Sequence, residues 1–315
     1  MHLVTILGAT CSGKSQLAID YAKTFTNQGK VAWIVSCDSR QVYKDFNLAS
    51  AKIPGAWKQY ENTTLKAFYY QDVPHFLVDF VDLNIRYSLV EYIQDFVALI
   101  KLSQNLIKPP DVLILCGGTG LYARAINQKY DLGLIKPEFE PEYNELKAKL
   151  QKQNLDDLLA LVYQDYNSKA EYEKLNNSEK HNPPRIVNLL LKSRAKQDNW
   201  HYRIDFPAFE SNSIFGIRVD QRELALKIQI RIEQRITNGM LQEIQSLITK
   251  YGHERIAELG LEGSIGVNYW QNKLTLQQFQ TQLLLETIQY AKRQQTWLNK
   301  EPNLEWIQGV AQIHN

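Results

Sequence analysis

Short runs of apolar residues recur along the chain, and each has the length of one buried β-strand. They cover residues 2–7, 30–37, 76–81, 111–116 and 213–219. Unbroken apolar runs of about four to eight residues are typical of strands covered on both faces, as in a parallel sheet. Segments between these runs place apolar residues at helical spacing. The pattern therefore predicts an α/β core of about five parallel strands flanked by helices.

One of these helices carries a clear start and stop signal. Apolar residues at helical spacing follow Ser88, and Glu91 lies three positions later, as in a capping box. The pair Pro109-Pro110 then ends the pattern, because proline cannot continue a helix. We expect a helix from about Ser88 to residue 107. The stretch 47–71 before it is polar and gives no regular pattern.

The chain changes character between residues 131 and 200. Residues 138–173 are rich in Glu, Lys, Leu and Asp at helical spacing, and no strand-like run interrupts them. The part that follows is basic and carries no acidic residue from 180 to 196, with Lys180, Arg185, Lys192, Arg194 and Lys196. We interpret 131–200 as an all-helical insertion between a first core part at 1–130 and a second at 201–315. Its basic end suits a phosphate backbone, although a solvated helix face would explain the charge equally well.

The second core part is mainly helical after its strand. Residues 220–251 form one long amphipathic segment, and Arg231 and Arg235 lie four apart, hence on one face of a helix. A loop with Gly260, Gly263 and Gly266 comes next. A last helical segment covers 274–300 and ends with cationic, polar and aromatic groups: Lys292, Arg293, Gln294 and Trp297. Such a mixture is typical of a helix that faces nucleic acid, but basic residues also occur at helix C-termini because they complement the dipole.

A phosphate-binding pattern follows the first strand. Residues 8–15 read Gly-Ala-Thr-Cys-Ser-Gly-Lys-Ser, which fits a glycine, four free positions and Gly-Lys-Ser. In such a loop the backbone amides and the helix N-terminus face the phosphates, the lysine reaches the terminal phosphates, and the serine holds Mg²⁺. A chance match in a Gly/Ser turn is the alternative, but the strand before and the helix after are the expected context. The predicted diphosphate or nucleotide site comprises Gly8, Ala9, Thr10, Cys11, Ser12, Gly13, Lys14 and Ser15.

Two other strand ends carry candidate chemistry. Asp38 follows the run 30–37, and the carboxyl ends of strands in an open α/β sheet face the ligand crevice. It is a candidate base, magnesium ligand or helix cap. The run 111–116 ends not in an acid but in Gly117-Gly-Thr119, which argues against a motor-type or switch-type nucleotide hydrolase and favours a loop in which Thr119 contacts a ligand. Asp79 resembles the magnesium acid of such hydrolases, but the apolar run continues past it.

Composition limits the remaining classes. The chain has 315 residues, 44% hydrophobic and 22% charged, with a formal net charge of +2, so it is typical of a globular protein and any basic surface must be local. Its three cysteines have no CxxC spacing, which predicts neither a disulfide framework nor a zinc site. The apolar runs are too short to cross a membrane, and no leader precedes the first one. We expect a cytoplasmic protein without a membrane partner.

Taken in order, these segments resemble the tRNA dimethylallyltransferases, the isopentenyl transferases that modify the adenosine next to the anticodon. The resemblance extends over nearly the whole chain. It rests on residues 8–15, 38–43, 51–52, 73–75 with 79, 87–88, 117–122, 182–185, 231 with 239, and 290–298. The chain departs from the family pattern at Phe76, at 181–185 and at 265–268, which reads Ile-Gly-Val-Asn.

The resemblance implies a P-loop NTPase-like parallel sheet with a helical insertion that clamps the anticodon stem-loop. It implies transfer of a dimethylallyl group from dimethylallyl diphosphate to N6 of adenosine 37 in tRNA, with Mg²⁺ as cofactor, giving N6-dimethylallyladenosine and diphosphate. The partners are then tRNA and dimethylallyl diphosphate, and we expect a monomer. Two alternatives from other classes are a P-loop small-molecule kinase and a nucleotide-dependent RNA-binding module without catalysis.

The resemblance also implies roles for individual residues. Asp38 would be the general base for the adenine amine, Thr10 and Lys14 would bind the diphosphate, Ser15 would hold its Mg²⁺, and Arg231 would act on the phosphate side. The catalytic residues are then Asp38, Thr10 and Arg231. The residues expected to contact tRNA are Asp38, Ser39, Arg40, Gln41, Thr119, Arg185, Lys292, Arg293, Gln294 and Trp297.

Overall fold

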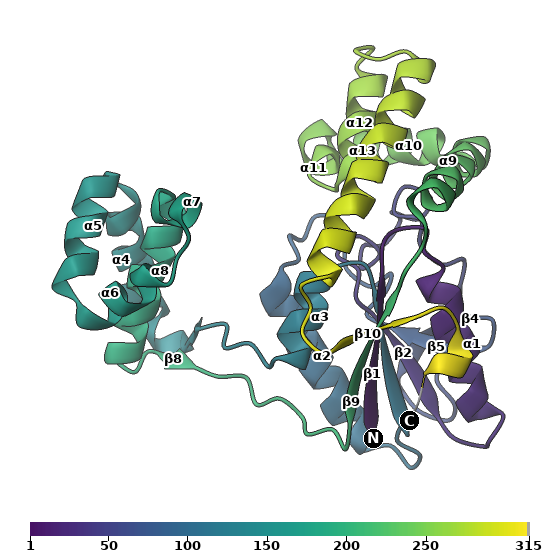
Figure 1. The fold of residues 1–315 in the computed structure, drawn as a ribbon, viewed down its shortest axis with the longest axis horizontal. Coiled ribbons are helices and arrows are strands. Elements are labelled where there is room, and N and C mark those ends of the chain that lie inside the picture. The colour runs from purple at the N-terminus through teal and green to yellow at the C-terminus, as the bar shows by residue number, and fades with distance from the viewer. Residues whose placement is uncertain (314–315) are drawn as a thin grey trace. The chain divides into compact units, whose positions relative to one another are not determined.

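The computed structural model describes residues 1–313, and its chain forms two compact units (Figure 1). The first unit consists of Met1–Lys129 together with the chain from Phe206 onward, and the second is Tyr130–Asp205. Among the described residues, no helix is long and apolar enough to cross a membrane. Cys11, Cys37 and Cys116 are all free thiols.

An eight-stranded sheet organises the described part of the first unit, in the order β10-β9-β1-β6-β2-β5-β4-β3. Its central strands are parallel and buried, as their apolar sequences predict. In register, Ile6 of β1 lies between Cys116 of β6 and Phe215 of β9. The α/β class is thus confirmed. The central strands are β1 (His2–Gly8), β2 (Ala32–Ser36), β6 (Val112–Gly117) and β9 (Asn212–Ile217).

The sheet has three more strands than the apolar runs predict. The stretch 47–71, expected to be irregular, contains β3 (Ala56–Gln59) and β4 (Lys66–Tyr70), which pair antiparallel. A third addition, β10 (Leu304–Ile307), pairs parallel to β9. β3 and β10 are edge strands that carry exposed polar residues, so their sequences lack the continuous apolar run of a central strand.

The strand expected at 76–81 is wrong in position, because β5 is Val73–Phe76. The chain leaves the sheet at Leu77 and Asp79, which have positive φ of 54° each. Their segment instead pairs with the loop after β2, where Asp79 N–H donates to Gln41 O at 2.8 Å. Its apolar side chains are buried against this loop, which explains why the sequence resembles a strand.

Three helices cover the sheet near its central strands. They are α1 (Lys14–Thr26), α2 (Leu89–Gln104) and α3 (Gly120–Asn127). Helix α2 begins where the sequence predicts, because Ser88 and Glu91 form the expected capping box. Ala18, Ile19 and Ala22 of α1 are fully buried in a core that includes Ile6 and Ile114. A short 3₁₀ turn at Val310–Gln312 lies beyond β10.

Five further helices share a second core of the first unit, and they are seen at the top of Figure 1. They are α9 (Gln221–Thr237), α10 (Met240–Tyr251), α11 (His253–Ala257), α12 (Leu261–Trp270) and α13 (Leu276–Leu298). The single long segment expected over 220–251 is interrupted at Gly239, which precedes α10 with φ 101°.

The loop predicted to contain Gly260, Gly263 and Gly266 is partly wrong as well, since Gly263 and Gly266 lie inside α12. A Cβ on Gly263 would lie 2.1 Å from the carbonyl oxygen of Ile256, and one on Gly266 would lie 2.9 Å from the Ile244 side chain. These glycines therefore permit close helix packing rather than chain reversal. Gly260, with φ 93°, does precede the helix as a loop residue.

The second unit is a small helical body with its own core, centred on Leu158, Ile186 and Leu191. Its two chain ends are joined by a short antiparallel ladder between β7 (Leu134–Ile135) and β8 (His201–Tyr202), which an all-helical interpretation did not include. The helices are a 3₁₀ turn at Pro137–Phe139, α4 (Glu140–Gln151), α5 (Leu155–Gln164), α6 (Tyr166–Glu173), α7 (Asn177–Lys180) and α8 (Pro183–Gln197).

Candidate active site

The predicted phosphate loop connects β1 to α1. Gly13 lies at the N-cap of α1 with φ 88°, and Cys11 also has a positive φ of 61°. A Cβ on Gly8 would lie 2.3 Å from Ser12 Oγ, so a larger residue here would force the Ser12 side chain to move. Ser12 Oγ is buried and has no hydrogen-bond partner among the described residues. A buried donor without a protein partner is what a loop built around an anion would contain.

Lys14 lies over this loop. Its Nζ donates to Ala9 O at 3.3 Å, and burial lowers the pKa of Lys14 below its usual value. The negative charge of Asp38 raises that pKa and the positive charge of Arg231 lowers it, so both groups lie close enough to act on the ammonium. The structure thus brings the loop lysine, the candidate base and the candidate arginine to one place.

Asp38 follows β2 and orients its own loop. Its Oδ1 accepts the backbone N–H groups of Arg40 at 2.9 Å and Gln41 at 3.2 Å. The carboxylate therefore closes a turn at 38–41 rather than capping a helix. Because only Oδ1 is used in these two bonds, Oδ2 remains a possible acceptor for a bound group.

The glycine loop after β6 lies directly against the Asp38 loop. Thr119 N–H donates to Cys37 O at 3.1 Å, and Thr119 Oγ1 accepts the N–H of Ser39 at 3.0 Å. A Cβ on Gly117 would lie 1.9 Å from Cys37 O. Glycine is thus required at 117 by the close approach of two backbones, and Thr119 is fixed beside the Asp38 loop.

Arg231 reaches the phosphate loop from α9. Its Nη1 donates to Cys11 Sγ at 3.6 Å, and its Nη2 donates to Ala51 O at 3.0 Å. Arg235, on the same helix face, instead binds the backbone of Leu48 and Ala49 and pairs with Glu262 at 3.0 Å. Of the two arginines, only Arg231 is therefore directed at the phosphate loop.

The C-terminal end of α13 contacts both the phosphate loop and the glycine loop after β6. Gln294 Oε1 accepts the N–H of Thr10 at 2.9 Å, and its Nε2 donates to Gly118 O at 2.9 Å. The ring of Trp297 lies so close to Gly120 that a Cβ there would be 2.2 Å away. Gln294 and Trp297 thus have structural contacts within the first unit, whereas Lys292 and Arg293 beside them are exposed.

Two residues of this attachment were not singled out by sequence reasoning. The guanidinium of Arg124 lies 4.2 Å from the Trp297 ring centre, and its Nε donates to Glu301 Oε2 at 2.8 Å. Arg124 belongs to α3 and Glu301 follows α13, so the pair lies 177 positions apart. No short-range pattern links residues at such a separation.

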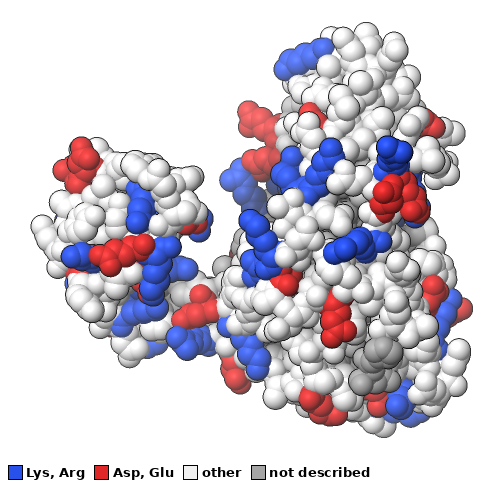
Figure 2. Space-filling model, in the orientation of Figure 1, with Lys and Arg blue, Asp and Glu red and all other residues white. Residues whose placement is uncertain are grey.

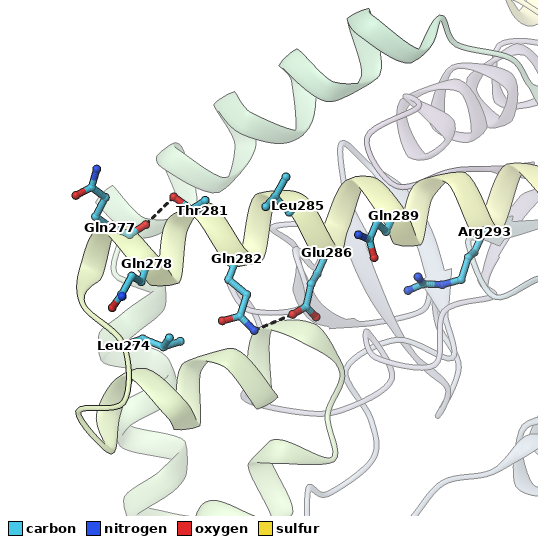
Figure 3. Close-up of a pocket in the computed structure, with 9 residues that line it drawn as sticks. All are labelled: Leu274, Gln277, Gln278, Thr281, Gln282, Leu285, Glu286, Gln289 and Arg293. Carbon is cyan, nitrogen blue, oxygen red and sulfur yellow. Dashed lines mark hydrogen bonds between the residues drawn. The ribbon is translucent and has the colours of Figure 1, made fainter.

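A groove runs along α13 (Figure 3). Its volume is about 750 Å³, and more of its lining surface is apolar than polar, although most of the lining side chains end in polar groups. Arg293, one of the residues expected to contact tRNA, lines its end. The lining residues are Leu274, Gln277, Gln278, Thr281, Gln282, Leu285, Glu286, Gln289 and Arg293.

Asp79 does not resemble a metal ligand in its surroundings. Its Oδ1 accepts Lys52 Nζ at 2.6 Å, and its Oδ2 accepts Trp57 Nε1 at 3.0 Å. Both oxygens are therefore engaged by protein donors. Among residues 1–313, no group of three or more His, Cys, Asp and Glu side chains converges as a metal site.

Arg185 lies on α8 of the second unit, where it is exposed and pairs with Glu179. Lys192, Arg194 and Lys196 on the same helix are also exposed, and Arg194 pairs with Asp198 at 2.6 Å. Figure 2 shows basic side chains together on the visible face of this unit, with acidic ones among them. The basic residues expected at the end of this unit are thus largely exposed, although ion pairs neutralise part of their charge.

A phosphate-loop motif between the first strand and the first helix of a mostly parallel sheet, with a carboxylate and an arginine beside it, defines an α/β fold of the P-loop type. The model of the IPP transferase family matches residues 41–301. The chain therefore belongs to the IPP transferase family, as its sequence resemblance indicates.

Named relatives agree. A tRNA dimethylallyltransferase of Nostoc sp. is 31% identical over 97% of this chain and 93% of its own length. The tRNA dimethylallyltransferase 2 of Shewanella sediminis is 29% identical over 99% and 95%, respectively.

Solved structures share the fold. The tRNA isopentenylpyrophosphate transferase of Bacillus halodurans aligns with a TM-score of 0.64 and 23% identity, over 98% of this chain and 89% of that one. A eukaryotic dimethylallyltransferase acting on tRNA aligns with a TM-score of 0.69 and 21% identity, over 99% of this chain and 75% of that one.

Proposed function

We propose that this chain transfers a dimethylallyl group from dimethylallyl diphosphate to N6 of adenosine 37 in tRNA, releasing diphosphate and leaving N6-dimethylallyladenosine. The observation that carries the proposal is the grouping of Lys14, Arg231 and Asp38 around one phosphate loop in a chain of the IPP transferase family. The two cations can stabilise the negative charge of a departing diphosphate, and the carboxylate can accept a proton from the attacking amine.

The leaving group is held by the phosphate loop. The backbone amides of the phosphate loop that no protein acceptor occupies, the N-terminus of α1 and the Ser12 hydroxyl would donate to the phosphate oxygens. Lys14 and Arg231 add fixed positive charge where negative charge develops as the C–O bond breaks. Thr10 adds its hydroxyl from within the loop. The allylic C–O bond breaks readily with diphosphate as the leaving group, because the positive charge that develops on carbon is delocalised over the allyl group.

Mg²⁺ fits the donors present. Ser15, in the first turn of α1, would offer a hydroxyl oxygen, and the diphosphate and water would supply the other hard oxygen ligands that Mg²⁺ prefers. When bound, the ion would neutralise charge on the leaving diphosphate. No carboxylate cluster is needed for such a site.

Asp38 acts on the acceptor. The adenine N6 lone pair is conjugated into the ring and is a weak nucleophile. As the new C–N bond forms and the C–O bond breaks, the N6 proton passes to Asp38, whose orientation the 38–41 turn fixes. Ser39, Arg40, Gln41 and Thr119 lie on the two adjoining loops and are proposed to contact the base and its neighbours.

The second unit is proposed to bind the anticodon stem-loop. Exposed Arg185, Lys192 and Lys196 on α8 suit an RNA backbone, and Lys292 and Arg293 of α13 are exposed on the first unit. The target base must leave its stack, at a cost of a few kcal/mol that backbone contacts offset. We further propose that the protein acts as a cytoplasmic monomer.

The test is direct. The purified protein is incubated with dimethylallyl diphosphate, Mg²⁺ and unmodified tRNA that carries adenosines at positions 36–38. The tRNA is then digested, and its nucleosides are identified by mass spectrometry. We expect an adenosine heavier by one dimethylallyl group. No such product, together with a higher melting temperature in ATP than in dimethylallyl diphosphate, would favour a small-molecule kinase instead.

A further inference from the structure

Residues 47–52, which we call the 47–52 platform, are held by charged side chains from distant elements. Glu243 of α10 binds one side of it. Its Oε1 accepts the backbone N–H groups of Asn47 at 3.0 Å and Ala49 at 2.9 Å, and its Oε2 accepts that of Leu48 at 2.8 Å. One carboxylate thus fixes three consecutive amides, with charge-assisted hydrogen bonds.

Two cations, Arg235 of α9 and the platform's own Lys52, hold oxygen atoms of this segment and of residues near it. Arg235, which is buried, donates to the carbonyls of Leu48 and Ala49. The Lys52 ammonium donates to Tyr43 O at 2.6 Å and to Asn47 Oδ1 at 2.8 Å, besides its 2.6 Å ion pair with Asp79. The buried charges of Arg235 and Lys52 are thus compensated by hydrogen bonds and ion pairs, which hold the segment in one conformation.

Ala51 lies between these anchored positions, two residues after Ala49 and one before Lys52. Its φ is 51°, a region that residues other than glycine seldom adopt. Its carbonyl accepts Arg231 Nη2 at 3.0 Å and Gln41 Nε2 at 3.3 Å. Local strain of this kind persists only where surrounding contacts over-determine the backbone, and it clusters at functional sites.

We infer that the 47–52 platform positions Arg231 for the diphosphate, and that Glu243 and Lys52 are positioning residues that act through it. The Ala51 carbonyl holds one end of the guanidinium while Cys11 Sγ meets the other. A guanidinium has five N–H donors in a fixed plane. Two of these donors are held by protein acceptors, which fixes the direction in which the other three N–H groups point. This inference rests on the proposed function, because it takes the diphosphate as the ligand of Arg231.

Binding of inorganic pyrophosphate in the presence of Mg²⁺, measured by calorimetry, tests this through a double-mutant cycle. Glu243→Gln removes the charge and replaces one acceptor oxygen by a donor. We expect it to weaken pyrophosphate about 10-fold, the scale of a lost hydrogen bond to a charged group. In an Arg231→Ala background, we expect Glu243→Gln to cause almost no further loss, because the group it positions is gone.

Kinetics supply a second readout. Glu243→Gln should raise KM for dimethylallyl diphosphate and leave the affinity for tRNA unchanged. Glu233→Gln is the matched control, since Glu233 is an exposed carboxylate on the helix of Arg231. That variant should bind pyrophosphate like the wild type.

The same cycle is run with Asp79→Asn, which removes the charge that pairs with Lys52 and so weakens the other contact that holds the platform. It covers the case in which Glu243→Gln does not fold. Equal losses with and without Arg231, in whichever variant folds, would overturn the inference, as would an unchanged pyrophosphate affinity.

The binding cycle needs no turnover, so the two proposals can fail separately. A wild-type chain that binds pyrophosphate but forms no prenylated adenosine would contradict the proposed function alone. An additive cycle in an active enzyme would contradict the positioning role alone. A wild-type chain that binds no pyrophosphate would overturn both.

Discussion

The side-chain carbonyl of Gln294 accepts the backbone N–H of Thr10 at 2.9 Å. A side chain 284 positions away thus takes one amide of the phosphate loop, and its own amide group binds the glycine loop at Gly118. The end of α13 therefore sets the spacing between the loop expected to hold the diphosphate and the loop that contacts the Asp38 segment.

Replacing Gln294 by glutamate tests this relationship. Gln294→Glu keeps an acceptor for Thr10 but cannot donate to Gly118, and it places a negative charge beside the loop expected to bind the diphosphate, which it would repel. We expect pyrophosphate affinity to fall about 10-fold or more, the effect of roughly 1.4 kcal/mol of like-charge repulsion. Gln294→Ala is the control, and calorimetry should show a smaller loss for it. An equal loss in both variants would mean that charge is not the cause.

Asp38→Asn separates the turn from the proton transfer. An amide oxygen still accepts the N–H groups of Arg40 and Gln41, so the 38–41 turn should persist. Single-turnover rates of prenyl transfer should fall about 100-fold or more, the usual scale for loss of a general base. Binding of tRNA and pyrophosphate, measured separately, should be retained. A variant with near-normal rates would remove Asp38 from the proposed mechanism.

Thiol labelling should distinguish the three cysteines. Burial raises the pKa of Cys37, and it raises the pKa of Cys116 to about 12, so both stay protonated and inert. Cys11 is partly exposed in the phosphate loop. We expect iodoacetamide to modify Cys11 alone in the native protein and to block pyrophosphate binding, with pyrophosphate protecting. Peptide mass mapping checks the site, and inactivation at the same rate with and without pyrophosphate would contradict it.

His75 should make stability depend on pH. It is buried in β5, and burial lowers its pKa to about 4. Below its ordinary pKa of about 6.5 the unfolded chain binds a proton that the folded chain does not. The free energy of unfolding should therefore fall by up to about 1.4 kcal/mol per pH unit as pH drops from 6.5 to 4.

Urea titrations at pH 7.5 and 5 measure this effect, with His75→Gln as the comparison. The variant lacks the titrating group, so its loss of stability between the two pH values should be smaller than that of the wild type. A parallel decline in both proteins would assign the pH dependence to other groups.

Basic residues of α8 should contribute to tRNA binding through counterion release. Arg185→Ala and Lys196→Ala should each reduce the slope of log affinity against log salt by about 0.7 to 1. Lys101→Ala, an exposed lysine on α2, is the control and should leave the slope unchanged. Filter binding across a salt series gives the slopes, and unaltered slopes in both α8 variants would argue against this helix as an RNA contact.

The sequence predicts those features whose signals are local. The phosphate loop needs only eight adjacent residues, and the start of α2 needs only Ser88 and Glu91, so both lie where expected. The central strands are recognised because burial on both faces requires continuous apolar runs. Edge strand β3 has no such requirement, and its pattern is indistinguishable from a loop.

Contacts between distant residues were beyond sequence reasoning. Glu243 holds amides that lie about 195 positions earlier, and neither partner carries a local signature of the contact. Gly263 and Gly266 illustrate the same limit, since the need for glycine comes from Ile256 and Ile244 on neighbouring helices. The residues around the phosphate loop could therefore be named in advance, but not what orients them.

The position of β9 bears on how the chain is synthesised. β1 pairs with β6 on one side and with β9 on the other, and β9 comes only after the whole Tyr130–Asp205 unit. While the ribosome is producing that unit, the nascent β1 has an open edge, which is a template for wrong pairing. Translation rate and chaperone access during this interval, rather than the stability of the finished protein, should then govern the yield of correctly folded enzyme.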